Sequence, residues 1–138
     1  MTDGELWRDA PAPSLDDFAA IAESAFAGLP APFRRLAGEV IFRIDEFASD
    51  EVLGDLGLED PFELTGLYQG LALDRRSILD PAPEPARVFL YRRPILDEWA
   101  ERGDVTLAEL ITHVLIHEIG HHFGLSDADI EAIESGRR

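Results

Sequence analysis

The sequence contains no cysteine and no lysine, and its one methionine is the first residue. Without cysteine there can be no disulfide bond, no thiolate ligand for zinc and no cysteine nucleophile. Without lysine, all 12 basic side chains are arginines; they face 28 acidic residues, and the formal net charge is −16. A strongly anionic chain repels phosphate backbones, so we do not expect it to bind nucleic acid.

Long hydrophobic runs and targeting signals are also missing. No apolar run approaches the roughly 18 residues that a membrane-spanning helix needs, so we expect no membrane association. The opening MTDGELWRDAPAPS lacks the basic and apolar regions of a secretory signal, which predicts a cytoplasmic protein. A chain of 138 residues can build one sizeable core. We therefore expect a flexible tail over residues 1–13 and a single domain over residues 14–138.

Potential capping boxes mark the starts of three expected helices. Each pairs a hydroxyl with a carboxylate three residues later: Ser14 with Asp17, Thr106 with Glu109, and Ser126 with Asp129. The first helix should be amphipathic and end near Gly28. The second has apolar residues around most of its circumference, so it should be largely buried and end before Gly124. A further short helix is expected from Pro94 to near Gly103.

Three segments have the β-branched and aromatic composition of strands. They are residues 39–47, 62–73 and 87–92. The last two flank the proline-rich segment 80–86, so we expect them to form a wide hairpin. Residues 48–61 carry acids, glycines and a proline, and we expect an exposed loop there.

All four histidines lie within ten residues of the helix that is expected to be buried. His117 and His121 are one helical turn apart, so their imidazoles can converge on one point. Glu118 lies between them in the motif H-E-x-x-H. Two neutral imidazoles hold Zn²⁺, the ion lowers the pKa of its bound water towards 7, and a neighbouring carboxylate accepts the proton. The motif predicts one zinc ion per chain and a catalytic role for Glu118.

The third zinc ligand is expected beyond a glycine turn. Gly124 follows His121 by three residues, and Asp127 follows Gly124 by three. Because glycine adopts left-handed conformations without a Cβ penalty, the chain can turn back beneath the helix and bring Asp127 to the metal. Glu131 and Glu134 are the alternative third ligands. The alternative role for Asp127 is to complement the dipole of the last helix.

The two remaining histidines carry weaker signals. His122 lies about 140° around the helix from His117, so we expect it to face away from the metal. His113 lies one turn before His117 on nearly the same face. It either supports the ligands or contacts substrate, or it is a hydrogen-bonded core histidine.

The segment HEIGHHFGLSD resembles the active-site motif of the zincin metallopeptidases, with aspartate where metzincins have their last histidine. Metzincins also carry a downstream methionine turn, which this chain lacks. Most of residues 14–135, including LTGLYQG and VFLYRRPILDEW, is instead similar to the small bacterial minimal zincins. This resemblance implies an α+β single domain in which a small mixed β-sheet packs against the HExxH helix and an N-terminal helix.

The resemblance also implies a zinc metallopeptidase acting on a peptide or protein. Zincin substrates commonly pair with an edge strand, and residues 66–70 are the candidate edge. Tyr68 or Tyr91 is the candidate donor to the oxyanion; the alternative for each is an ordinary core or surface aromatic. Because one small domain supplies only one wall of a cleft, a homo-oligomer or another partner would complete it.

Two other functions fit part of the pattern. A non-catalytic zinc- or peptide-binding regulatory module would keep the metal site, but Glu118→Ala would leave its function unchanged. A zincin-like nuclease is disfavoured by Glu118 and by the net charge of −16.

Overall fold

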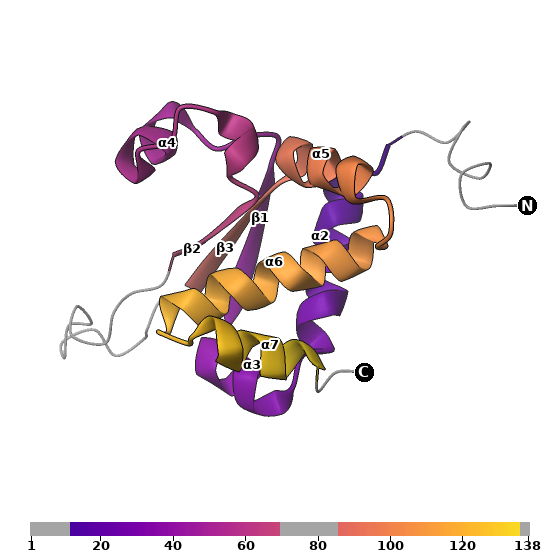
Figure 1. Ribbon diagram of the computed structural model, residues 1–138, viewed down its shortest axis with the longest axis vertical. Helices are drawn as coiled ribbons and strands as arrows, with labels where there is room; N and C mark the ends of the chain where they lie inside the picture. The colour runs from indigo at the N-terminus through magenta and orange to yellow at the C-terminus, as the bar shows by residue number, and fades with distance from the viewer. Residues whose placement is uncertain (1–11, 70–85, 136–138) are drawn as a thin grey trace, which may run out of the picture.

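A mixed three-stranded sheet forms the middle of the fold in the computed structural model, which describes residues 12–69 and 86–135 (Figure 1). The strands are β1 (Val40–Asp45), β2 (Gly66–Gln69) and β3 (Ala86–Tyr91). β3 is the central strand, parallel to β1 and antiparallel to β2. The expected pairing of the second and third strands is therefore confirmed, and β2 is an edge.

Six α-helices and one 3₁₀ turn accompany this sheet in the described residues. They are α2 (Leu15–Ala27), α3 (Ala31–Ala37), α4 (Asp50–Leu56), η1 (Pro61–Glu63), α5 (Arg92–Arg102), α6 (Leu107–His122) and α7 (Asp127–Ser135). α2 and α6 contact each other and the sheet, and α7 follows α6 back along its length (Figure 1). The α+β class, the small mixed sheet and its packing against the motif helix and an N-terminal helix are as predicted.

The main core lies between the sheet and the pair α2 and α6. Phe18 on α2, Val88 and Leu90 on β3, and Ile111 and Leu115 on α6 are all fully buried in it. Burial of such side chains stabilises the fold by about 1.5–3 kcal/mol each. α6 is therefore a core element, and any side chain on its remaining face is held on a rigid support.

A second, smaller cluster corrects the prediction for residues 48–61. Instead of an exposed loop, this segment forms α4, with Ser49 capping its first turn. Leu53 of α4 is buried against Tyr91. A seven-residue helix gains little from propensity and depends on such tertiary contact, which the local sequence does not display.

Several other boundaries differ from the sequence prediction. α3 was not predicted: Pro30, which follows the expected end of the first helix near Gly28, is the N-cap of this second helix. The expected strand over 62–73 begins only at Gly66, after the turn η1; its residues 70–73 lie outside the described part, as do residues 80–85 of the expected turn. α5 begins at Arg92, directly after β3 and two residues before Pro94.

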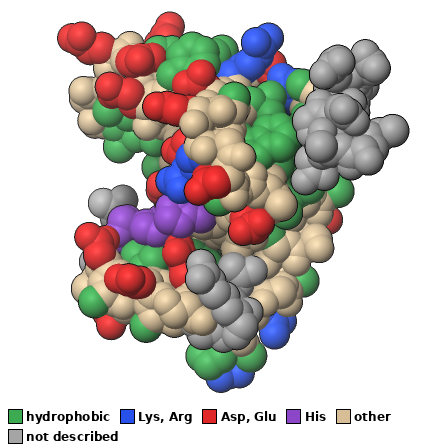
Figure 2. Space-filling view, turned by 45° about the vertical axis from the view of Figure 1, so that its right-hand side comes forward, with side chains coloured by type: hydrophobic (Ala, Val, Ile, Leu, Met, Phe, Trp, Pro, Cys, Tyr) green, Lys and Arg blue, Asp and Glu red, His purple; other side chains and the backbone are tan. Residues whose placement is uncertain are grey.

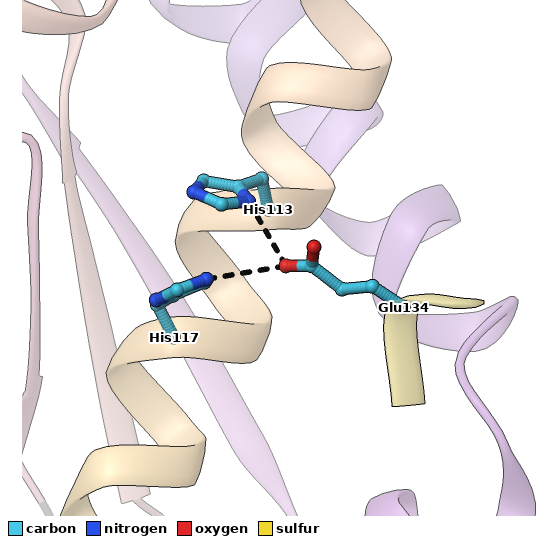
Figure 3. A group of neighbouring side chains, drawn as sticks. All are labelled: His113, His117 and Glu134. Atoms are coloured by element: carbon cyan, nitrogen blue, oxygen red, sulfur yellow. Dashed lines mark ion pairs between the residues drawn. The ribbon is translucent and has the colours of Figure 1, made fainter. Parts of the chain in front are cut away.

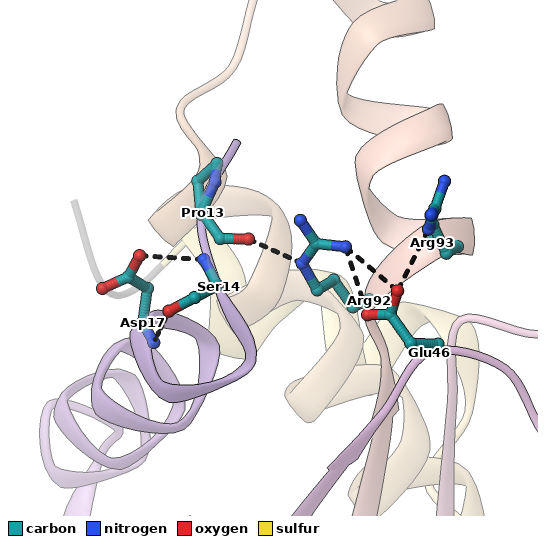
Figure 4. Close-up of polar contacts among 6 residues, drawn as sticks. All are labelled: Pro13, Ser14, Asp17, Glu46, Arg92 and Arg93. Carbon is teal, nitrogen blue, oxygen red and sulfur yellow. Dashed lines mark hydrogen bonds and ion pairs between the residues drawn. The ribbon is translucent and has the colours of Figure 1, made fainter. Parts of the chain in front are cut away.

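An arginine–carboxylate network joins the chain before α2 to the start of α5 and the residue after β1 (Figure 4). Nε of Arg92 donates to the carbonyl oxygen of Pro13 at 2.6 Å, and its Nη1 donates to both carboxylate oxygens of Glu46 at 3.1 and 3.2 Å. Nε of Arg93 donates to the same carboxylate at 3.1 Å. The adjacent capping box of Ser14 and Asp17 is formed as predicted. Most of the expected tail, residues 1–11, lies outside the described residues.

Candidate metal centre

α6 presents one face of histidines from an otherwise buried helix. Thr106 and Glu109 form the predicted capping box at its start, and nine of its residues are buried. Gly124 has a φ of 78° and ends the helix as expected. Beyond it, Ser126 and Asp129 cap α7. The helix that carries the motif is thus fixed at both ends and along its buried face.

Three imidazoles lie in a row along the exposed side of α6. His113, His117 and His121 follow one another at intervals of one turn, with ring centroids 4.0 Å apart for the first pair and 5.5 Å for the second. α7 places two carboxylates opposite this row, Glu134 near its start and Asp127 near its end. The histidine side chains gather in a hollow of the surface, with acidic side chains on both sides and basic ones at its upper rim (Figure 2).

His113, His117 and Glu134 form a group that could hold a metal ion (Figure 3). Oε1 of Glu134 lies 2.9 Å from Nδ1 of His113 and 3.2 Å from Nε2 of His117. Despite these short distances, this buried oxygen accepts no hydrogen bond from any described residue. Two imidazole nitrogens and a carboxylate oxygen that converge in this way are a donor set suited to zinc.

The predicted ligands are only partly brought together. Nε2 of His121 lies 3.1 Å from Oδ1 of Asp127, so the glycine turn does return the aspartate to a motif histidine. His117 instead approaches Glu134. In the described part of the chain, the one group of three ligand atoms within 4.8 Å of one another is the group that contains Glu134. Glu131, the other alternative third ligand, is exposed and lies outside this group.

The approach of His113 to Glu134 is the feature that sequence analysis missed. Each residue was a candidate by itself, but their pairing depends on how α7 lies along α6. Gly120 sets this approach, since a Cβ there would lie 3.0 Å from Cγ1 of Ile130 on α7. The available signal was the four-residue repeat His113, His117, His121 opposite acids spaced along the next helix.

Glu118 lies on the flank of α6 that faces the edge strand. A Cβ on Gly66 of β2 would lie 3.5 Å from Cγ of Glu118. Burial raises the pKa of Glu118, and the nearby charge of His121 acts in the opposite direction. Burial also lowers the pKa of His117, with a further contribution from His113. A lowered pKa favours the neutral imidazole, which is the form that binds metals.

The two candidate tyrosines lie on different strands. Tyr68 on β2 is buried, with its ring centroid 4.3 Å from that of His122 and 5.7 Å from that of Phe123. Tyr91 at the end of β3 is 2% exposed. Burial raises its pKa to about 12, and the charges of Asp45 and Glu118 add to the increase. Tyr91 is therefore a protonated phenol within electrostatic range of Glu118.

Comparison with known families assigns most of the chain. A family model described as zincin-like metallopeptidase matches residues 37–137, which include the whole sheet, α6 and α7. No curated protein matches the sequence. None of the helices in the described ranges is long and apolar enough to cross a membrane.

Proposed function

From the premise that this chain belongs to the zincin-like metallopeptidase family, we propose that it is a zinc-dependent peptidase in which Glu118 is the general base. The observation that carries this proposal is the position of Glu118. It stands between a row of imidazoles on α6 and the edge strand β2.

The proposed ligands of the catalytic zinc are His117, His121 and Asp127. Imidazole nitrogen and carboxylate oxygen are the donors of zinc sites that contain no thiolate. The 3.1 Å approach of Oδ1 of Asp127 to Nε2 of His121 supports this set. Glu134 is the alternative third ligand, and its unsatisfied Oε1 favours it over Glu131. When bound, zinc acts as a Lewis acid and makes a coordinated water a nucleophile near neutral pH.

Glu118 is suited to move the proton in this reaction. A general base works best when its pKa lies close to the operating pH, and burial shifts Glu118 in that direction. The carboxylate takes a proton from water and passes it to the leaving amine of the substrate. Tyr91, held protonated in its buried position and within electrostatic range of Glu118, is the proposed donor to the oxyanion.

The substrate is proposed to be a peptide in extended conformation. β2 pairs with β3 along one side only, so its other side is a free edge among the described strands. A free edge can accept a peptide strand through main-chain hydrogen bonds. A peptide there would run past the flank of α6 that carries Glu118.

Metal analysis and a cleavage assay on Glu118→Gln test the proposal. We expect wild-type protein to bind one zinc ion per chain and to cleave an unstructured protein such as casein. Glu118→Gln should keep the zinc and lose at least about 100-fold in cleavage rate, because general-base catalysis contributes 10²–10⁴-fold.

The matched control is Glu101→Gln, an exposed acid on α5, which should keep full activity. Wild-type protein that stays free of zinc after zinc is added would refute the proposal. Equal cleavage by wild type and Glu118→Gln would refute the role of Glu118. Zinc binding without any cleavage would favour the regulatory-module alternative.

A further inference from the structure

The seam between α6 and α7 offers ligands for two metal positions. The outer position is the proposed catalytic set of His117, His121 and Asp127. The inner position consists of His113 Nδ1, His117 Nε2 and Glu134 Oε1, one helical turn further back along α6. We propose that the inner position binds a zinc ion in its own right, and that the two positions are occupied alternately because both require His117.

The geometry of the inner position carries the first part of the proposal. Its three donor atoms lie within 4.8 Å of one another. Oε1 of Glu134 is buried between the two imidazoles and accepts no hydrogen bond from the described residues. A buried carboxylate oxygen without a hydrogen bond costs about 1–3 kcal/mol or more, and a bound cation removes that cost.

The inner position is also open to an ion from solution. The side chains of His113, His117 and Glu134 are 38%, 31% and 30% exposed. They project from α6 and α7 towards one another across the seam (Figure 3). Three protein ligands leave the fourth position of a tetrahedral ion to water.

The second part of the proposal, alternate occupancy, follows from the histidine that both positions share, His117. Nε2 of His117 faces Glu134, and a ring nitrogen has one lone pair, so an ion at the inner position removes this nitrogen from the outer one. An ion at the inner position would bind His117 together with His113, which lies one turn before it on α6, whereas His121 lies one turn after it. An ion at the inner position is therefore displaced from His121 and Asp127. This competition rests on the proposed function, whereas zinc binding at the inner position does not.

Zinc titration of full-length variants against a chromophoric chelator tests the inner position. His121→Ala/Asp127→Ala, which lacks the outer ligands, should still bind one zinc ion. Adding Glu134→Gln should weaken that binding at least about 10-fold, the minimum seen when a supporting partner of a metal ligand is lost. Adding Glu131→Gln instead, on the same helix but outside the group, should leave it unchanged. No zinc binding by the double variant, or equal effects of the two glutamine substitutions, would overturn the proposal.

A measurement on unmodified protein makes the test independent of variant folding. In protein labelled with ¹⁵N-histidine, added zinc should shift the Nδ1 resonance of His113. An unshifted resonance at full zinc loading would overturn the alternate occupancy of the two positions. Binding of one ion in total is expected, and two ions per chain would overturn the alternation.

The two proposals fail separately. Zinc binding by His121→Ala/Asp127→Ala together with no cleavage by wild type would refute the peptidase and keep the inner position. Cleavage by wild type together with no zinc binding by that variant would refute the inner position and keep the peptidase. If both hold, His113→Ala/Glu134→Gln should cleave faster than wild type at limiting zinc, because the competing position is gone.

Discussion

Gly124 is the residue that returns the chain from α6 to α7. Its φ of 78° lies in the left-handed region, directly after the C-cap Phe123. The N–H of Gly124 donates to the carbonyl of His121 at 3.0 Å, and that of Leu125 donates to the carbonyl of Gly120 at 2.9 Å. This pair of bonds is a Schellman motif. The position of Asp127 beside His121 depends on this one backbone conformation.

Gly124→Ala should therefore destabilise the protein by about 1–2 kcal/mol, the cost of a left-handed conformation for a residue with a Cβ. No atom lies within 4 Å of the position that the Cβ would take, so backbone strain is the whole effect. Urea denaturation followed by circular dichroism measures it. The control is Gly54→Ala in α4, where the Cβ also meets nothing within 4 Å and φ is not positive. That change should stabilise by about 0.5–1 kcal/mol, and a loss of stability equal to that of Gly124→Ala would contradict the argument.

At the scale of elements, β2 and α6 approach each other so closely at Gly66 that even a Cβ would require its neighbours to shift. A Cβ there would lie 2.8 Å from Cγ1 of Val114 and 3.1 Å from the carbonyl oxygen of Phe89. The second neighbour is backbone of the central strand, which would have to shift by a few tenths of an ångström. This close contact also holds the edge strand against the flank of α6 that carries Glu118.

Gly66→Ala should destabilise the protein by about 1–3 kcal/mol through overpacking. A double-mutant cycle with Val114→Ala should show a favourable coupling, since the smaller residue removes one of the two clashes. Thermal and urea unfolding measure all four proteins. Wild-type stability in Gly66→Ala, or strict additivity in the cycle, would show that the strand does not approach the helix in this way.

The elements that sequence alone predicted are those whose signals are local. The capping boxes at Ser14, Thr106 and Ser126 fixed three helix starts, because hydroxyl and carboxylate act within four residues. α3 and α4 were missed because seven-residue helices form through tertiary contacts, such as Leu53 of α4 on Tyr91.

The candidate site also combines a feature with a local sequence signal and a feature that depends on tertiary packing. The motif spacing predicted that a glycine turn brings Asp127 back towards the metal ligands, and Oδ1 of Asp127 lies 3.1 Å from Nε2 of His121; its role as a ligand stays a prediction. The approach of Glu134 to His113 depends on the packing of α7 along the whole of α6. Gly120 and Ile130 determine that packing, and neither residue carries a metal-site signal of its own.

At the scale of the whole molecule, the network around Arg92 joins segments that are far apart in the sequence. Its Nε–Pro13 bond spans 79 residues, and its bonds to Glu46 span 46. The side chain of Arg92 is only 15% exposed, whereas that of Arg93 is 58% exposed. The two arginines bind one carboxylate from very different environments.

Arg92→Met should lower the free energy of unfolding by about 1.5–3 kcal/mol, the usual range for hydrogen bonds that involve a charged group. Arg93→Met should lower it by less than about 1 kcal/mol, because solvent screens an exposed ion pair. Urea unfolding at constant ionic strength compares them. Equal losses would show that burial of Arg92 adds nothing to the network.

The charge of Glu46 gives this network a defined pH dependence. The hydrogen bond from Arg93 is the main cause that lowers the pKa of Glu46 below its ordinary value of 4.5; partial burial opposes it and Arg92 reinforces it. A carboxylate with a lowered pKa in the folded state stabilises the protein fully above its unfolded pKa, and loses that contribution as the pH falls through the folded pKa. Wild type should therefore exceed Glu46→Gln in stability by a constant amount at pH 6–8. The difference should shrink as the pH falls below about 4.5.

The control is the same comparison in an Arg92→Met/Arg93→Met background. There the stability difference between the proteins with and without Glu46→Gln should be absent at every pH, because without the two guanidinium groups Glu46 gains nothing from being charged. A difference that persists unchanged into acid, or that survives in that background, would assign the stabilisation to the shape of the side chain rather than to its charge.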